Sequence, residues 1–92
     1  MAEGSLKDKA FLQQRIIEII IKKIGVEPQK VTLSSRFRKD LEADSLEVLD
    51  VIQAVEREFG INLDDVPNDA ISTVGRLIEI VAKRADERMA KS

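Results

Sequence analysis

Between Asp44 and Gly60 the chain repeats apolar residues at spacings of three and four, and this repeat constrains the fold more than any other feature of the sequence. Such spacing places one apolar stripe along an α-helix. Asp44 can cap the start of that helix, with Glu47 completing a capping box, and Gly60 is the residue type expected just past its end. The expected helix covers residues 45–59, with a core-facing stripe of Leu46, Leu49, Ile52, Val55 and Phe59.

Two more apolar repeats predict helices on either side of this one. The first begins with a capping-box pattern over residues 5–8 and runs to Ile24, where Gly25 follows. The last begins after the capping residue Thr73 and runs to about residue 88, packing through Leu77, Ile78, Val81 and Ala85.

The segments between these helices have no sustained periodicity. Residues 26–43 are expected to form a long loop held in the core by Val31, Phe37 and Leu41, and a loop of this length is often functional. Residues 61–71 are expected to be irregular, with at most a brief helix that has Pro67 in its first turn. The predicted fold class is therefore all-α: a small four-helix bundle of three long helices and one short helix, with a long loop after the first helix.

The 92 residues suffice for one domain with one core. We expect a flexible N-terminal tail over residues 1–5, a single domain over 6–88 and a flexible C-terminal tail over 89–92. A monomer is expected. The longest apolar run, residues 19–21, is far too short to span a membrane, and no secretory signal pattern is present.

The absence of histidine and cysteine excludes disulfides, thiolate metal sites and thiol nucleophiles. Ser45 is expected at the first position of the central helix with its hydroxyl outward, but no residue in the chain forms an obvious base for it. No nucleophile–base pair or metal cluster can be assembled, so neither an enzyme nor a metal site is predicted. A serine placed in this way indicates a site that other enzymes modify.

Charge is distributed unevenly along the chain. Residues 40–70 carry ten acidic residues against one base, Arg57, whereas residues 1–39 carry nine Lys and Arg against four acids. The acidic segment would attract a basic protein surface and repel nucleic acid, so no nucleic-acid partner is expected.

The start of the central helix resembles a known family signature. Residues 37–46 read FRKDLEADSL and closely resemble the F-x-x-D-L-G-A-D-S-L signature of acyl carrier proteins. Residues 47–59 resemble the acidic helix of that family, which ends in an E-x-x-F pattern formed here by Glu56 and Phe59. Residues 24–26 and 71–74 resemble the end of its first helix and the opening of its last. The resemblance covers roughly residues 12–85 with the spacings preserved.

This resemblance implies a carrier whose cofactor is 4′-phosphopantetheine. Ser45 would be the attachment point, modified from coenzyme A by a separate phosphopantetheinyl transferase that supplies the Mg²⁺ and the general base. The arm would carry acyl groups as thioesters for cytoplasmic enzymes of fatty-acid or related lipid or polyketide biosynthesis. Acyl synthases and transferases of such pathways present basic patches to the second helix, and the expected contact residues are Asp44, Leu46, Glu47, Leu49, Asp50, Glu56 and Glu58.

The cargo is expected between the second and third long helices. The expected lining residues, which equally fit a plain hydrophobic core, are Val51, Ile52, Val55, Ile61, Leu63 and Ile71.

The chain departs from the family pattern at the residue two before Asp44. Glu42 stands there in place of the usual glycine, and a positive φ at that position would strain a non-glycine residue. This departure suggests a specialised carrier. Two alternatives stay open: a peptidyl or aminoacyl carrier, and a non-covalent helical adaptor that never bears the arm.

Overall fold

Three α-helices organise the chain in the computed structural model, which describes residues 9–91. They are α1 (Lys9–Ile24), α2 (Ser45–Phe59) and α3 (Val74–Lys91), with single 3₁₀ turns η1 (Pro28–Lys30) and η2 (Asn68–Ala70) in the connections. The all-α prediction is confirmed, and the predicted fourth helix is the short turn η2, directly after Pro67. The expected tail over residues 1–5 and the capping box over 5–8 lie outside the described residues.

Local signals set most of the helix ends. Gly25 and Gly60 follow α1 and α2 with φ of 79° and 64°, the left-handed conformation that glycine adopts without steric cost. The Thr73 hydroxyl accepts a hydrogen bond from the Arg76 N–H at 3.1 Å and caps α3, as predicted. The end of α3 was predicted near residue 88, but the helix continues to Lys91.

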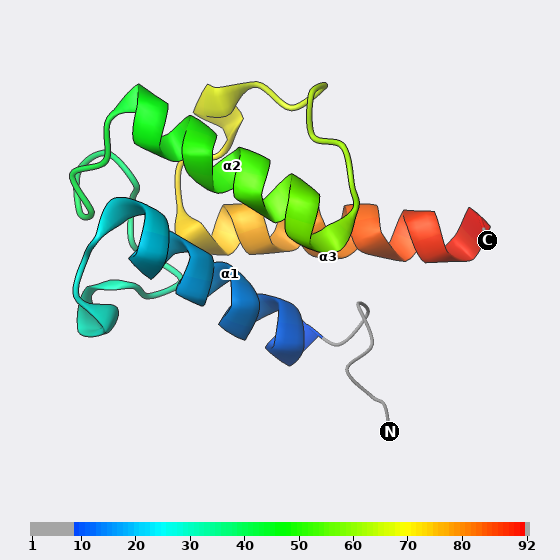
Figure 1. The fold of residues 1–92 in the computed structure, drawn as a ribbon, viewed down its shortest axis with the longest axis horizontal. Coiled ribbons are helices and arrows are strands. Elements are labelled where there is room, and N and C mark those ends of the chain that lie inside the picture. Colours follow the sequence, from blue (N-terminus) through cyan, green and yellow to red (C-terminus); the bar gives the residue numbers. More distant parts are fainter. Residues whose placement is uncertain (1–8, 92) are drawn as a thin grey trace.

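Figure 1 shows how the helices pack. α1 (blue to cyan) runs opposite to α2 (green), whereas α3 (orange to red) runs in the same direction as α2. The end of α1 and the starts of α2 and α3 therefore lie toward the same end of the molecule (Figure 1). α1 contacts both other helices, and the four predicted packing residues of α3 are all buried: Leu77, Ile78, Val81 and Ala85.

The predicted apolar stripe of α2 is wrong at two positions. Leu46 is 73% exposed and Leu49 38% exposed. At about 100° per residue, Leu46 lies roughly 160° around the helix from the buried Val48 and cannot share its face. Apolar residues occupy so many positions of α2 that two stripes satisfy the same spacing, and the packed one consists of Val48, Val51, Ile52, Val55 and Phe59.

Within the described part of the chain no helix is both long and apolar enough to cross a membrane.

The connection from α2 to α3 is held by an arginine of α3. Arg84 Nη1 donates to the backbone oxygen of Asn62 at 2.7 Å and to Asp65 Oδ1 at 3.0 Å. The side-chain hydrogen bond from Arg84 is the main cause that lowers the pKa of the Asp65 carboxyl below its usual value. The ionised carboxylate thus stabilises the loop against α3.

We expect Asp65→Asn to lower stability at neutral pH and to lose this effect in acid. Because the folded-state pKa of Asp65 is lowered, its contribution is present above the unfolded value of about 3.9 and disappears as pH falls through the folded value. Urea unfolding of both proteins at several pH values should show midpoints that begin to approach each other as pH falls below about 4 and that coincide once pH is below the folded-state pKa of Asp65. Asp64→Asn removes the same charge one residue away and is the control, and an equal effect in both variants would contradict the pairing.

Candidate functional site

The start of α2 is fixed by the predicted capping box. Asp44 Oδ1 accepts a hydrogen bond from the Glu47 N–H at 2.8 Å, and Glu47 Oε1 accepts one from the Asp44 N–H at 3.0 Å. These bonds satisfy backbone donors that have no partner inside the helix. Ser45 is the first residue of α2 and is exposed, as predicted.

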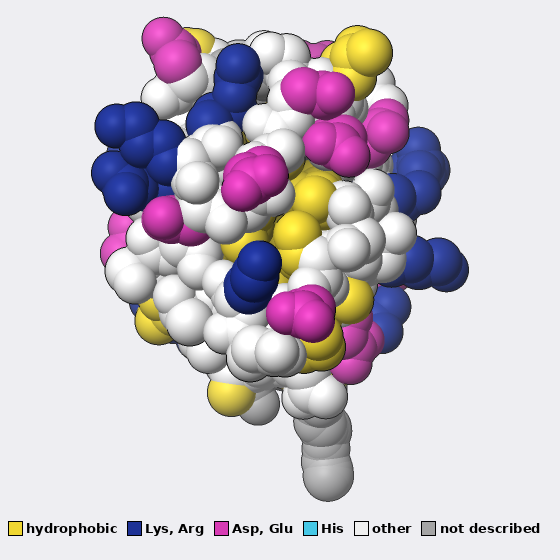
Figure 2. All heavy atoms as spheres, turned by 90° about the vertical axis from the view of Figure 1, so that its left-hand side faces the viewer, with side chains coloured by type: hydrophobic (Ala, Val, Ile, Leu, Met, Phe, Trp, Pro, Cys, Tyr) yellow, Lys and Arg dark blue, Asp and Glu magenta, His cyan; other side chains and the backbone are white. Residues whose placement is uncertain are grey.

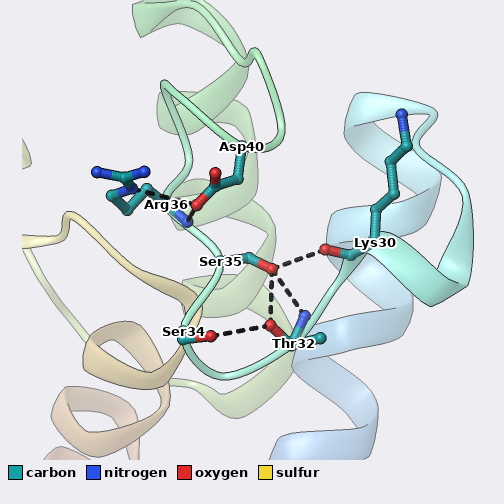
Figure 3. Close-up of polar contacts among 6 residues, drawn as sticks. All are labelled: Lys30, Thr32, Ser34, Ser35, Arg36 and Asp40. Carbon is teal, nitrogen blue, oxygen red and sulfur yellow. Dashed lines mark hydrogen bonds and ion pairs between the residues drawn. The ribbon is translucent and has the colours of Figure 1, made fainter.

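The long loop before α2 is organised by one buried polar side chain, Ser35 (Figure 3). Its hydroxyl donates to the Lys30 backbone oxygen at 2.7 Å and accepts from the Thr32 N–H at 2.9 Å. The Thr32 and Ser35 hydroxyl oxygens lie 3.0 Å apart. The end of η1 at Lys30 is thereby connected to Thr32 and Ser35, which belong to no helix or strand.

The loop is also bonded to the start of α3. The Phe37 N–H donates to the Ser72 oxygen and the Val74 N–H to the Ser35 oxygen, each at 3.0 Å. The Gly75 N–H donates to the Leu33 oxygen at 2.8 Å, and a Cβ at Gly75 would lie only 2.9 Å from that oxygen. Val31, Phe37 and Leu41 are buried, which confirms the predicted anchors of the loop.

A second turn leads from the docked part of the loop toward Ser45. Asp40 Oδ2 accepts from the Arg36 N–H at 2.7 Å and from Arg36 Nε at 3.2 Å (Figure 3). The backbone and side-chain hydrogen bonds from Arg36 lower the pKa of the Asp40 carboxyl, so Asp40 stays ionised and closes the turn.

The chain then passes through a strained residue. Glu42 has φ of 55° and is the one non-glycine residue with positive φ in the described chain. The buried Ala43 follows, and its N–H donates to the Phe37 oxygen at 2.8 Å. The sequence raised the question whether position 42 needs a positive φ. The structure has one there, so Glu42 has the steric cost of this conformation.

The side chain nearest to the Ser45 hydroxyl was missed by sequence reasoning. Arg38 Nη1 donates to Ser45 Oγ at 2.9 Å. Arg38 lies in the loop seven positions before the first residue of α2, and no periodicity relates the two residues, so only the folded turn brings them together. A guanidinium cannot accept a proton, so this neighbour cannot act as a base for the serine.

A cavity of about 590 Å³ opens beside Ser45. Figure 2 shows the end of the molecule where α1 ends and where α2 and α3 begin. Hydrophobic side chains are visible there between basic and acidic ones. The cavity wall combines three apolar side chains with cationic and polar ones, and its lining consists of Arg36, Phe37, Arg38, Lys39, Ser45, Val48, Asp69, Ile71 and Ser72.

The residues predicted to line a cargo pocket are only partly at this cavity. Ile71 lines it, whereas Val51 and Val55 are fully buried in the core. Ile52 and Leu63 are also buried, and Ile61 is half-buried. All six side chains belong to the core or pack against it.

The residues predicted as a partner face divide into two groups. The side chains of Leu46, Leu49 and Asp50 are exposed, and within residues 9–91 the Asp50 carboxylate has no hydrogen bond or ion pair. Glu56 Oε2, in contrast, accepts from the Leu63 N–H at 2.7 Å, and Glu58 Oε2 accepts from Arg15 Nε at 2.9 Å.

The Glu58 contact is an ion pair that joins α2 to α1. Arg15 Nη2 lies 2.6 Å from Glu58 Oε2, and hydrogen bonding to Glu58 is the main cause that raises the pKa of Arg15. Glu56 and Glu58 therefore have internal roles, while Asp44 and Glu47 serve the cap.

Two comparisons with known proteins bear on this site. The profile of a family described as "Phosphopantetheine attachment site" matches residues 14–81. A protein of Amoebophilus asiaticus (strain 5a2) described as "Acyl carrier protein" is 38% identical over 77 residues, which is 84% of this chain and 96% of that protein.

We expect Glu42→Gly to stabilise the fold. The left-handed conformation costs a non-glycine residue about 1–3 kcal/mol, and glycine gives back about 0.5–1 kcal/mol through the entropy of the unfolded chain. The net gain should be roughly 1 kcal/mol, which raises the melting temperature by about 4–8 °C.

The matched control for this experiment is Glu27→Gly. Glu27 is an exposed loop glutamate with φ of −69°, where glycine brings its entropic cost, removes an exposed hydrogen bond from Gln29 Nε2 and relieves no strain, so it should destabilise. Thermal unfolding of the three proteins measures both effects, and destabilisation by both glycines would show that Glu42 is not strained.

Proposed function

The chain belongs to the acyl carrier proteins of the phosphopantetheine-attachment family, and from that premise we propose that Ser45 bears the arm on which it delivers acyl groups to enzymes of fatty-acid or related lipid or polyketide biosynthesis. Members of this family are carriers rather than catalysts, and their prosthetic group is a covalent 4′-phosphopantetheine.

One observation carries the assignment of Ser45. Its hydroxyl is exposed at the first residue of α2, on the rim of a cavity and 2.9 Å from a guanidinium group. These surroundings fit a 4′-phosphopantetheine group. Arg38 can balance the charge of its phosphodiester, and the apolar wall of the cavity can lie beside the uncharged part of the arm. When bound, the arm supplies a terminal thiol on which acyl groups are carried as thioesters.

The same surroundings support modification by a separate enzyme. Arg38 donates to Ser45 Oγ, so the hydroxyl has a hydrogen-bond donor and not a base beside it and gains no nucleophilicity from this contact. A transferase that brings the Mg²⁺ and the general base would complete the site. The exposed cap leaves the hydroxyl open to such an enzyme.

Partner enzymes would meet the exposed side of α2. Leu46 and Leu49 supply apolar surface next to Ser45, and Asp44, Glu47 and Asp50 supply negative charge. Charges of this kind act mainly by raising the rate of encounter with a basic surface. Glu56 and Glu58 were predicted in the same face, but their internal hydrogen bonds make them weaker candidates.

Cargo would be sheltered by apolar residues between α2 and α3. Ile71 already lines the cavity beside Ser45, and Val51, Ile52, Val55, Ile61 and Leu63 lie in or against the core. Because Val51 and Val55 are fully buried, an acyl chain could reach them only if the core side chains moved apart. We therefore propose that cargo enters at Ile71.

Incubation with coenzyme A, Mg²⁺ and a phosphopantetheinyl transferase should add one phosphopantetheine to the chain, measured as the intact mass. Ser45→Ala should abolish the gain, because no other hydroxyl occupies the same position at the start of α2.

Ser72→Ala is the matched control for the loading experiment. Ser72 is an exposed serine on the same cavity, and its replacement should leave loading intact. Loading of the Ser45→Ala variant would contradict the assignment of the site. No gain from transferases that load another carrier in parallel would contradict the carrier function and favour an adaptor without an arm.

Asp50 and Glu58 were both predicted in the partner face, but their different contacts lead us to expect different effects of replacing them. Asp50→Asn should lower kcat/KM for loading by about 1.4- to fivefold at low salt, because an exposed charge pair contributes about 0.2–1 kcal/mol to association. Salt should reduce the difference. Glu58→Gln should instead lower the thermal stability, because it breaks the ion pair with Arg15, and should change loading little. Equal loading defects in both variants would contradict this division.

A further inference from the structure

We propose that Arg38 is a positioning residue for the prosthetic group: its guanidinium pairs with the phosphodiester once Ser45 is modified and holds that phosphate at the rim of the cavity. This inference rests on the proposed function, since it requires that Ser45 carries the arm.

The contact that carries the inference already exists in the unmodified chain. Arg38 Nη1 lies 2.9 Å from Ser45 Oγ and donates to it. Modification replaces the hydroxyl hydrogen by phosphorus, which places anionic oxygens two bonds beyond Oγ. The neutral acceptor of Arg38 thus becomes part of a charged group, and a hydrogen bond from guanidinium to phosphate is about twice as strong as a neutral one.

The backbone that carries Arg38 is held in place. Phe37, the preceding residue, is 1% exposed, donates its N–H to the Ser72 oxygen and accepts the Ala43 N–H. Asp40 closes the following turn through its bonds to Arg36. Arg38 is therefore presented to Ser45 by a turn fixed on both sides, which lowers the entropy lost when the pair forms.

The neighbouring cations are less suited to the same role. The guanidinium of Arg36 is already paired with Asp40. Lys39 lines the same cavity, but within the described residues its ammonium group makes no contact with Ser45. Asp69, also on the cavity wall, is the acidic group in the lining and would repel a phosphate. The geometry therefore favours Arg38 for this role. Replacing Lys39 removes the same charge from the same cavity and provides the matched control.

The experiment compares the wild-type chain with Arg38→Gln and Lys39→Gln, each before and after loading. Thermal unfolding gives the change in melting temperature on loading, and ³¹P NMR gives the chemical shift and linewidth of the phosphodiester. Loading should raise the melting temperature of the wild type and of Lys39→Gln, and Arg38→Gln should lose roughly 1–5 °C of that gain. Its ³¹P signal should also shift and sharpen, because the phosphate is released from the pair.

Salt and a conservative variant add two further measurements. High salt should reduce the gain in the wild type and leave Arg38→Gln unchanged, since an exposed ion pair is screened. Arg38→Lys should recover part of the gain, because it keeps the charge but not the planar fork of donors.

Two results would overturn the inference. One is an identical ³¹P signal and loading gain in the wild type and Arg38→Gln; the other is an equal loss in Lys39→Gln, which would reflect only the net charge of the loop. Failure of the wild type to load at Ser45 would instead overturn the proposed function. The two failures are thus distinguishable by intact mass.

Discussion

The docking of the long loop onto the start of α3 is the constraint on which the site depends. A loop outside helices must find partners for its buried backbone groups, and here the start of α3 provides them. Three hydrogen bonds join Leu33, Ser35 and Phe37 to residues 72–75. Because the same loop leads into α2 through Ala43, these bonds set the position of Ser45, at the start of α2, relative to the start of α3. The close approach of the Leu33 oxygen explains why a glycine stands at position 75.

The conformation of Glu42 is a consequence of this docking. The chain must turn from the docked Phe37 segment to the capped start of α2, and the buried Ala43 between them fixes the direction of the turn. The backbone meets this requirement with a positive φ at Glu42. The acyl carrier protein signature that residues 37–46 resemble has a glycine at this position, so this chain accepts strain that a single substitution could remove. The exposed carboxylate of Glu42 adds negative charge two residues before the cap, where a partner that reads the start of α2 would meet it.

Local rules in the sequence predicted much of this structure. The ends of α2, the caps at Asp44 and Thr73 and the loop anchors depend on short-range chemistry that residue types reveal. The buried face of α2 could not be predicted in the same way, because its many apolar positions allow two stripes and only packing against α1 and the rest of the core selects one. Sequence also gave no sign of the contact between Arg38 and Ser45, which depends on the turn closed by Asp40. The placement of Glu58 beside Arg15 likewise requires the packing of α1 on α2.

These internal contacts balance part of the negative charge of the acidic segment, residues 40–70. Of its acids, Asp40, Glu58 and Asp65 are paired with arginines, and their charges are largely balanced within the molecule. The capping residues Asp44 and Glu47 bond to backbone N–H groups and keep their net charge, as does the exposed Asp50.

Within the described residues, uncompensated negative charge therefore remains at the first turns of α2, as it does at Glu42, Asp64 and Asp69, and the loop cations Arg38 and Lys39 line the cavity beside Ser45. A partner with a uniformly basic surface would be attracted by α2 and repelled by Lys39. In the modified chain Arg38 would add little to this repulsion, because its charge is balanced by the phosphodiester with which we propose it pairs. We therefore expect partner enzymes to place basic groups opposite α2 and an acidic group opposite Lys39.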